Sequence, residues 1–544
     1  MTTVTAPAAT AGVQRPARLS SRSRSLIITA VAYVLVLIGW EALARTVFEG
    51  QYLIGSPTGI VAALGDNTGL YWRALRVTLG QAAWGFLWGN LAAVALAAFV
   101  AVAPPVERVV LRLGLVVYCL PLVAIGPLLR VVFGTGTGPQ ITLAAFAVFY
   151  TTLIPLLVGL RAVPANWLEM VSTYGRGRFT KLLVVRARAS VPYLAGGLQI
   201  AVPAAFLGSL VGEFTGAERG MGILTIQALR SLNTEGLWAL ATISAVVSVT
   251  GYWFAGWLGR KLTVEQPPVL LTPPPVVTGR RSLPVRAALT VFEVAVTLAI
   301  VLGSWVGLIR LFDLNPFFAK TPADVWTWLF TAPTAEANRQ VIIDALSGTA
   351  WVAIPGYVAG LLLGAVLAAL FELKPAVRRT VTPLTVALRC VPIVAIAPLL
   401  VRSLGRGAIG TIITVALMSF FTTLIACSQG LRQTPGQVMD FFRVYRTSPT
   451  RTLALAQVPA MMPAFFAAAR LAVPASILAA TVAEWLATGT GMGNLMAVAA
   501  TNNEYALLWS ATVVLTTIAA IAYAAIAAVE RVVMRRVAPE QVSW

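Results

Sequence analysis

The chain has 544 residues, of which 58% are hydrophobic and 11% are charged, and its mean hydropathy is +0.83. This apolar share exceeds what a soluble protein of this length needs and is typical of a membrane-embedded one. The net charge of +20 does not form one soluble basic patch, which argues against nucleic-acid binding. The sequence has no histidine, which excludes a histidine base or metal ligand. Its three cysteines, Cys119, Cys390 and Cys427, all lie in apolar runs, which excludes a cysteine metal cluster or a secreted disulfide framework.

Residues 1–24 are small, polar and basic, and they predict a disordered cytoplasmic N-terminus. Apolar runs of about 20 residues follow, each long enough to cross a hydrocarbon core of about 30 Å. The first six lie near 25–44, 78–103, 110–132, 139–162, 193–214 and 237–258, and the second six near 288–310, 348–371, 381–401, 408–430, 463–485 and 507–530. They predict an all-α polytopic membrane protein with about twelve transmembrane helices. The first run is too long for a signal peptide, so we expect an uncleaved span.

One stretch of the chain occurs twice. Residues 119–129, CLPLVAIGPLL, return as 390–400, CVPIVAIAPLL, displaced by 271 residues. The same displacement relates 78–224 to 349–495 without a gap, and the first span repeats in a register of 265 residues that pairs Trp40 with Trp305. A repeat this long indicates a duplicated domain. The sequence therefore predicts two homologous six-helix halves, one over 25–262 and the other over 287–544.

The segment 263–286 between the halves contains six prolines and predicts an extended linker. Six spans per half place both linker ends on one side of the membrane, so the halves are parallel and related by an axis along the membrane normal. Most of the 40 Lys and Arg residues fall on the side of the linker and the termini. This bias predicts that the linker and both termini are cytoplasmic.

Each half has one long polar segment on the predicted cytoplasmic side, over 163–191 and 434–462. A short helix, a turn and a second stretch would form an element that a cytoplasmic partner could bind. The alternative is an amphipathic helix that lies on anionic lipid. The candidate residues are Glu169, Tyr174, Gly175, Arg176 and Arg178 in the first segment, and Asp440, Tyr445, Arg446 and Pro459 in the second.

These two segments resemble the coupling segments of binding-protein-dependent ABC importer permeases, and most closely those of the nitrate/sulfonate/taurine branch. The matching residues are Tyr174-Gly175 and Pro192-Tyr193 in the first segment, Tyr445, Pro459-Ala460 and Pro463 in the second, and Gly212-Glu213-Phe214 and Ala483-Glu484-Trp485 at the ends of the fifth spans. The family glycine is Arg446 in the second half, and the family proline is Arg188 in the first. Because arginine adopts a positive φ at a higher cost than glycine, we expect two unequal docking surfaces.

The resemblance implies the transmembrane subunit of an ABC importer that moves a small polar or anionic solute across a bacterial plasma membrane. It implies two separate ABC ATPase subunits that hold ATP and magnesium in the cytoplasm, and an extracytoplasmic solute-binding protein. The chain contains no Gly-x-x-x-x-Gly-Lys-Ser/Thr phosphate loop, so we expect neither a cofactor nor an enzymatic activity of its own. Two alternatives are a membrane scaffold and an ion-gradient-driven secondary transporter with two parallel six-helix halves. The latter often needs coupling acids, and Glu41, Glu293 and Glu372 each occur in one half alone.

Prolines recur at matching positions inside the apolar runs. They are Pro121, Pro127 and Pro203 in the first half, and Pro392, Pro398 and Pro474 in the second. Prolines free carbonyl groups and kink helices, which is tolerated where a helix lines protein or water. The paired set indicates a solute pathway with moving walls, whereas any single proline is explained equally well by ordinary helix packing.

Four charged residues inside or at the border of the membrane are further candidates for the pathway or its gate. Glu213 and Glu484 occur in both halves, and they either have a structural role, by capping or by pairing with Arg219 in the first half, or contact the solute. For an anionic solute we expect them to hold an outer gate. Arg389 and Arg470 occur only in the second half. They either attract an anionic or polar solute, or they reach a headgroup or pair with Glu372.

Overall fold

The computed structural model describes residues 34–35, 37–48, 54–163, 165–175, 177–262, 283–374, 377–378, 397, 400, 404 and 407–537, and all regular structure among them is helical. A short helical stretch at 37–46 comes first. The first half continues with α2 (Pro57–Asp66), α3 (Thr68–Val102), the 3-10 helix η1 (Pro104–Val106), α4 (Glu107–Cys119), α5 (Leu122–Phe133), α6 (Gly138–Arg161), α7 (Ala165–Thr173), α8 (Arg178–Thr180), the π-helix η2 (Lys181–Arg186), α9 (Ala187–Phe214), α10 (Met221–Arg230) and α11 (Thr234–Leu262).

The second half repeats this order. It contains α12 (Leu283–Leu311), α13 (Pro322–Trp326), the π-helix η3 (Thr327–Thr331), α14 (Ala335–Leu373), α17 (Ala408–Arg432), α18 (Gly436–Val444), α19 (Pro449–Thr452), the π-helix η4 (Leu453–Gln457), α20 (Val458–Ala483), the π-helix η5 (Glu484–Thr488), α21 (Gly491–Thr501) and α22 (Tyr505–Val537). The predicted terminal segment 1–24 lies outside the described residues, as does the predicted linker except for 283–286, where α12 begins.

Nine of the described helices are long and apolar enough to cross a membrane, and they coincide with nine of the twelve predicted spans. The predicted span over 110–132 is sharply bent: α4 and α5 meet there at 95°, as a broken span or a re-entrant loop. Leu120 precedes Pro121 and is extended, with φ −63° and ψ 127°, since a residue before proline avoids the helical conformation. The run at 25–44 lies partly outside the described residues, and that at 381–401 almost wholly so.

The same helix pairs form the core of each half. In the first half α6 packs between α3 and α9, and in the second α17 packs between α14 and α20. Glycines on α3 and α14 permit this close packing: a side chain at Gly85 would collide with Ala144 on α6, and one at Gly360 with Ser419 on α17. Small residues spaced four apart let membrane helices approach closely, and Gly89 and Gly356 complete matching Gly-x-x-x-Gly pairs.

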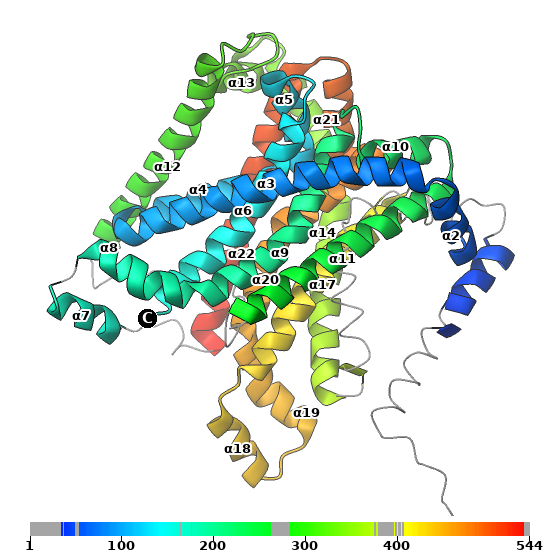
Figure 1. The fold of residues 1–544 in the computed structure, drawn as a ribbon. Coiled ribbons are helices and arrows are strands. Elements are labelled where there is room, and N and C mark those ends of the chain that lie inside the picture. The colour runs from blue at the N-terminus through cyan, green and yellow to red at the C-terminus, as the bar shows by residue number, and fades with distance from the viewer. Residues whose placement is uncertain are drawn as a thin grey trace, which may run out of the picture.

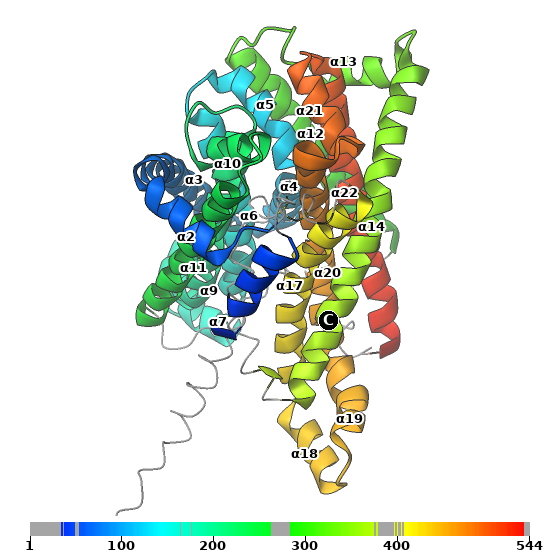
Figure 2. The same ribbon diagram turned by 90° about the vertical axis from the view of Figure 1, so that its right-hand side faces the viewer.

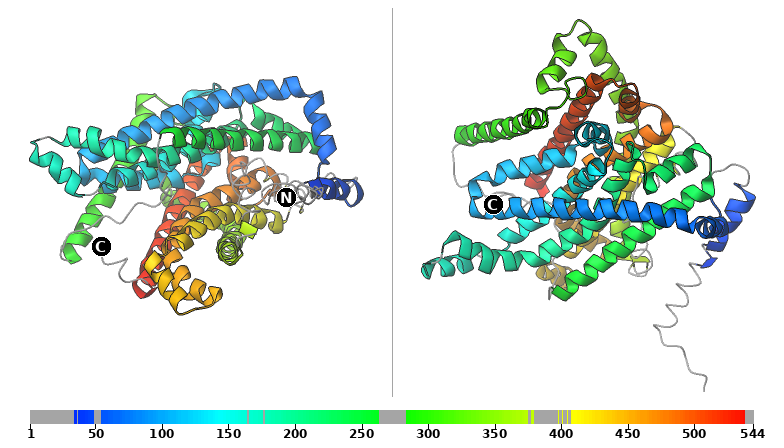
Figure 3. Two further views of the ribbon diagram at one scale, coloured as in Figure 1. Left: turned by 60° about the horizontal axis from the view of Figure 1, so that its bottom comes forward. Right: turned by 45° about the horizontal axis from the view of Figure 1, so that its top comes forward.

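The two halves meet along α5 and α9 on one side and α17 and α20 on the other. Leu122, Val123 and Val211 of the first half share one buried apolar cluster with Val415 and Ala479 of the second. In Figure 3 the helices of the first half, in blue to green, form one side of the molecule, and most of those of the second half form the other.

A charged contact adds to this interface. Glu293 on α12, the first helix of the second half, accepts hydrogen bonds from Arg108 at 2.9 Å and Arg112 at 3.0 Å, both on α4. The contact ties α12 to the opposite half.

The two ends of the molecule differ. Figure 1 and Figure 2 show α5, α13 and α21 at one end and α18 and α19 at the other, with α7 nearer to the latter end. The short helices α18 and α19 project beyond the long helices (Figure 2). The predicted coupling segments therefore lie away from the turns that follow α5 and α9.

Candidate functional site

The first coupling segment consists of α7, α8 and η2. Glu169 lies on α7 and is exposed, and Tyr174 follows the helix with 76% of its surface exposed. Trp167 and Met170 are exposed on the same helix. Arg176 lies outside the described residues, and Arg178 begins α8. The segment thus presents large apolar side chains on a polar element.

The second coupling segment, α18, α19 and η4, repeats this arrangement. Asp440 on α18 forms an exposed ion pair with Arg443 at 3.0 Å. Tyr445 is 70% exposed, and its ring centroid lies 4.7 Å from that of Phe441. Pro459 is the second residue of α20 and directly follows the π-helix η4, so it withholds one N–H from the carbonyls of the preceding turn.

The turn after each short helix has the same backbone geometry although its sequence differs. Gly175 has φ +67° and Arg446 has φ +49°. The Gly175 N–H donates to the Ser172 carbonyl at 2.9 Å, and the Arg446 N–H donates to the Arg443 carbonyl at 3.0 Å. Arg446 therefore retains the glycine turn, at a strain cost of about 1 kcal/mol or more. The two segments differ in the side chain that the turn presents, not in the path of the backbone.

A polar contact joins each predicted coupling segment to the C-terminal end of a long helix. Arg186, at the end of η2, donates to the Ala101 carbonyl on α3 at 3.1 Å. At the equivalent place the Gln457 amide, at the end of η4, donates to Glu372 on α14 at 3.2 Å. The contacts occupy matching positions but use different groups.

Glu213 is fully buried at the end of α9. Its Oε1 accepts a hydrogen bond from the Thr78 hydroxyl on α3 at 2.7 Å, and its Oε2 accepts one from the Gly222 N–H on α10 at 2.6 Å. The Thr78 hydroxyl in turn accepts from the Met221 N–H at 2.9 Å. The carboxylate therefore fastens the start of α10 and the side of α3 to the end of α9.

Glu484 makes the same contacts in the second half. It is 2% exposed, and its Oε2 accepts from the Thr349 hydroxyl at 2.9 Å and from the Gly493 N–H at 2.8 Å. The Met492 N–H donates to Thr349 at 2.8 Å. Of the two structural roles expected, capping is the one present, because Thr78 and the backbone of α10 rather than Arg219 satisfy Glu213. A role in a gate stays a prediction.

The described prolines occupy three kinds of place. Pro121 lies at the break between α4 and α5, and Pro127 lies inside α5. Pro203 and Pro474 lie at matching positions inside α9 and α20. Pro392 and Pro398 lie outside the described residues. Their role in a pathway is not tested by these positions.

Arg470 on α20 forms an ion pair with Glu530 on α22 at 3.0 Å, and its guanidinium carbon lies 6.0 Å from the ring centroid of Tyr523. The expected pairing of Arg470 with Glu372 is wrong, because α22 packs against α20 and brings Glu530 closer. Glu372 instead contacts Gln457 and, at 3.8 Å, Arg378. The equivalent residues of the first half are Gln199 and Gly259, which are uncharged. Arg389 lies outside the described residues.

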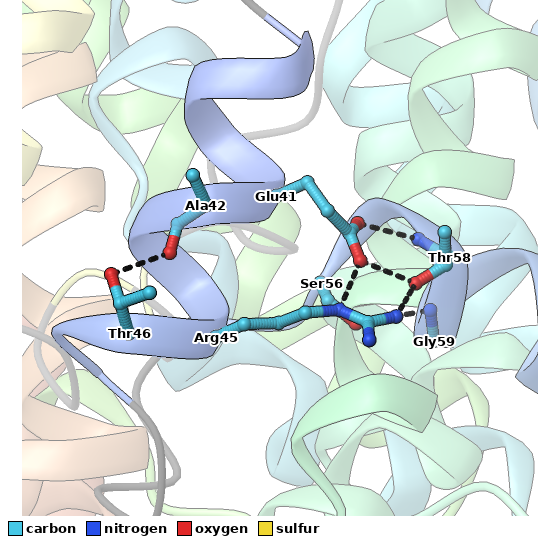
Figure 4. Close-up of polar contacts among 7 residues, drawn as sticks. All are labelled: Glu41, Ala42, Arg45, Thr46, Ser56, Thr58 and Gly59. Atoms are coloured by element: carbon cyan, nitrogen blue, oxygen red, sulfur yellow. Dashed lines mark hydrogen bonds and ion pairs between the residues drawn. The ribbon is translucent and has the colours of Figure 1, made fainter.

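Glu41 lies on the first helical stretch and binds the start of α2. It pairs with Arg45 and accepts from the Thr58 hydroxyl at 2.6 Å and the Thr58 N–H at 3.1 Å, as Figure 4 shows. The neighbouring Trp40 packs against Trp238 with ring centroids 5.4 Å apart, and Trp305 packs against Trp509 at 5.0 Å. This confirms the shifted register of the first span. Glu41 pairs with Arg45, so it has a cationic partner, as Glu293 and Glu372 do.

A cavity of about 620 Å³ lies between the halves at the end opposite the coupling segments. Arg130 of α5 and Arg230 of α10 line it from the first half, and Trp485, Thr501 and Tyr505 line it from the second. Sequence reasoning missed both arginines. The sequence signal that could have found them is an arginine near the C-terminal end of an apolar segment, with no acid beside it in the sequence.

The chain matches the family model of the binding-protein-dependent transport system inner membrane component twice, over residues 85–264 and 360–540. Each match covers the core of one half, and together they cover more than half of the chain. The chain belongs to this family. The duplication therefore places two copies of the permease domain in one polypeptide.

Curated relatives support the same assignment for a single half. A probable ABC transporter permease protein of Haemophilus influenzae is 30% identical over 225 residues, which is 41% of this chain and 91% of the relative. The riboflavin transport system permease protein of Chloroflexus aurantiacus is 29% identical over 45% of this chain and 95% of its own length. The nitrate import permease protein of Leptolyngbya laminosa is 25% identical over 41% of this chain and 83% of its own length.

The permease is therefore the transmembrane subunit of an ABC importer, a multi-pass inner-membrane protein built from two homologous halves. It is not itself an enzyme, because ATP hydrolysis in such systems belongs to separate subunits. Permeases of this family work with an ATPase and a substrate-binding protein.

Proposed function

We propose that two ATPase subunits dock on this one chain from the cytoplasm, one on α7 and α8 and the other on α18 and α19, and that they hold the ATP and magnesium. The supporting observation is the pair of exposed apolar groups on these elements: Trp167, Met170 and Tyr174 in the first half, Phe441 and Tyr445 in the second. Exposed apolar groups on a soluble element mark interaction sites. A helix that served only to lie on lipid would follow the membrane plane, whereas α18 projects beyond the long helices (Figure 2).

Movement of a docked ATPase would reach the membrane helices through two direct connections. The π-helices η2 and η4 continue without a break into α9 and α20, the helices that contain Pro203 and Pro474. The Arg186 and Gln457 contacts tie the same π-helices to α3 and α14. The proline-kinked helices then act as the moving walls of the pathway, with Glu213 and Glu484 holding the outer ends of both helices in place.

The solute is a small polar or anionic compound delivered by an extracytoplasmic binding protein. Relatives named for riboflavin, formylaminopyrimidine, aliphatic sulfonates and nitrate support this range. The excess of Lys and Arg near the linker and the termini supports a cytoplasmic position for both termini and for the coupling segments. The cavity at the opposite end then faces the binding protein.

The test removes the apolar side chains from each coupling segment. One variant carries Trp167→Ser and Tyr174→Ser, a second carries Phe441→Ser and Tyr445→Ser, and a third combines all four. Each permease is purified with its ATPase subunits, and both the amount of ATPase recovered and ATP-driven solute uptake are measured. We expect a partial loss of ATPase in each double variant and a complete loss in the combined variant.

Phe317→Ser is the matched control, because Phe317 is 56% exposed on the loop before α13, at the other end of the molecule. It should leave the amount of bound ATPase unchanged. Undiminished ATPase recovery with the combined variant would show that the docking surface lies elsewhere.

A further inference from the structure

The cavity between the halves is built from two chemically different walls. The first half supplies Arg130 and Arg230, and the second half supplies Trp485, Tyr505 and Thr501, together with Asn503. Its described lining residues include no aspartate or glutamate. The volume of about 620 Å³ falls within the range of about 300–1,000 Å³ that is typical of small-molecule sites.

The local packing holds Arg130 at this place. A side chain on Gly216, which has φ +120°, would occupy the position of the Arg130 guanidinium, and a side chain on Gly126 would collide with Thr215. Two glycines thus allow α5 to lie close against the turn after α9 and the guanidinium to lie against that turn. Arg130 is partly buried and makes no ion pair with any residue that the structure describes. Its charge is therefore available to a ligand.

Arg230 adds a second cation from α10. It likewise forms no ion pair with any described residue, and its exposed side chain lines the cavity. The residues at the equivalent positions of the second half are Val401 for Arg130 and Thr501 for Arg230. Among the described lining residues the positive charge therefore comes from the first half, while the second half offers three aromatic side chains, Phe318, Trp485 and Tyr505, and hydrogen-bonding groups.

We propose that this cavity is a transit site for a small organic anion. The anionic group lies between Arg130 and Arg230, where charge-assisted hydrogen bonds to guanidinium groups are strong, and the apolar part contacts Trp485 and Tyr505. Because the walls belong to different halves, a relative movement of the halves changes the site. The inference rests on the proposed function and narrows its solute class from polar or anionic to anionic.

Benzenesulfonate is a suitable probe because it combines one anionic group with one ring. Its affinity is measured by calorimetric titration of the purified full-length permease in nanodiscs of phosphatidylcholine, with benzyl alcohol as a neutral analogue and sulfate as an anion without a ring. We expect Arg130→Gln and Arg230→Gln each to weaken benzenesulfonate binding about tenfold, the effect of losing about 1.4 kcal/mol of binding free energy. Benzyl alcohol should bind more weakly to the wild type and respond to neither variant.

Two further variants keep the test decisive if an arginine variant fails to fold. Thr501→Arg places a third cation at the position equivalent to Arg230 and should strengthen benzenesulfonate binding. Arg73→Gln is the matched control, because Arg73 is exposed on α3 and lines a different cavity, and it should change nothing. Equal benzenesulfonate affinity in the wild type, Arg130→Gln and Arg230→Gln would overturn the proposal.

The same titration distinguishes a solute from a lipid headgroup. In nanodiscs that contain phosphatidylglycerol, a solute site retains its affinity for benzenesulfonate. Loss of benzenesulfonate binding there would identify the occupant as an anionic lipid and overturn the proposal. Uptake by the complete complex separates this inference from the proposed function. ATP-driven import without any benzenesulfonate binding would refute the anion site alone. Benzenesulfonate binding without ATPase docking would refute the proposed function.

Discussion

The two halves share the hydrogen bonds that hold their own helices together, but they differ in the charged residues at equivalent positions. The Thr78–Glu213–Gly222 contacts recur as Thr349–Glu484–Gly493, with the same threonine hydroxyl and glycine N–H donors, although Glu213 lies at the end of α9 and Glu484 begins η5. In contrast, the ion pair of Arg470 with Glu530 has only uncharged residues at the equivalent positions of the first half. Duplication has preserved the scaffold of each half, while individual charges have diverged between the copies.

The largest effect is expected from removing a buried carboxylate. Glu213→Ala leaves the buried Gly222 N–H without its acceptor and opens a void, so it should lower the free energy of unfolding by about 2–4 kcal/mol. Glu484→Ala should cost a similar amount because its contacts are the same. The thermal unfolding midpoint of the purified permease measures both.

Glutamine provides the control at each of these positions. In Glu213→Gln the amide oxygen can accept from the Gly222 N–H while the amide nitrogen donates to the Thr78 hydroxyl. In Glu484→Gln the amide oxygen can replace Oε2 and accept from both Thr349 and Gly493, so both variants should retain most of the stability. A large loss in only one half would contradict the claim that the two carboxylates have the same role.

The next effect concerns the ion pair that only one half possesses. Arg470→Gln copies Gln199 of the first half but leaves Glu530 unpaired, so it should lower the free energy of unfolding by about 2 kcal/mol. Adding Glu530→Gln should restore much of that loss, because no unpaired charge then remains. Chemical unfolding of the two variants measures the difference.

Solute uptake separates a structural role of Arg470 from a role in transport. If the ion pair is structural, the Arg470→Gln, Glu530→Gln double variant imports solute at the wild-type rate. A double variant that is stable but does not import would assign Arg470 to the solute pathway instead.

The smallest effect is expected at the turn of the second coupling segment. Arg446→Gly removes the strain of a positive φ on arginine and should stabilise the turn by at most about 1 kcal/mol. Gly175→Ala imposes that strain on the first segment and should destabilise it by a similar amount. Amide hydrogen exchange of the residues after α7 and α18 measures both, and faster exchange in Arg446→Gly would contradict the inferred strain.

The sequence predicted the architecture well because hydropathy and the repeat are global signals. Nine spans, the two halves and the shifted register of Trp40 and Trp305 all follow from patterns that extend over many residues. The break before α5 was less accessible: Pro121 marks its position, but a proline inside an apolar run is equally consistent with a mild kink. The angle depends on what α5 packs against in the other half.

The partners of individual charged residues could not be predicted. Arg470 lies 60 positions from Glu530, and only the packing of α22 on α20 brings them together. The sequence offered Arg219 as a partner of Glu213 because it is near in the chain, whereas the partner Thr78 lies 135 positions away. Arg130 became a candidate only once the structure placed it in a cavity with residues from the other half.

The central claim is that one chain supplies both ATPase-docking surfaces of the importer. Native mass spectrometry of the complex purified from its own membrane tests this directly, because the masses give the number of copies of each subunit. We predict one copy of this chain with two ATPase subunits, and one ATPase subunit fewer when Phe441→Ser and Tyr445→Ser are introduced together. Two copies of this chain in each complex, or a single ATPase subunit on the wild-type chain, would contradict the account.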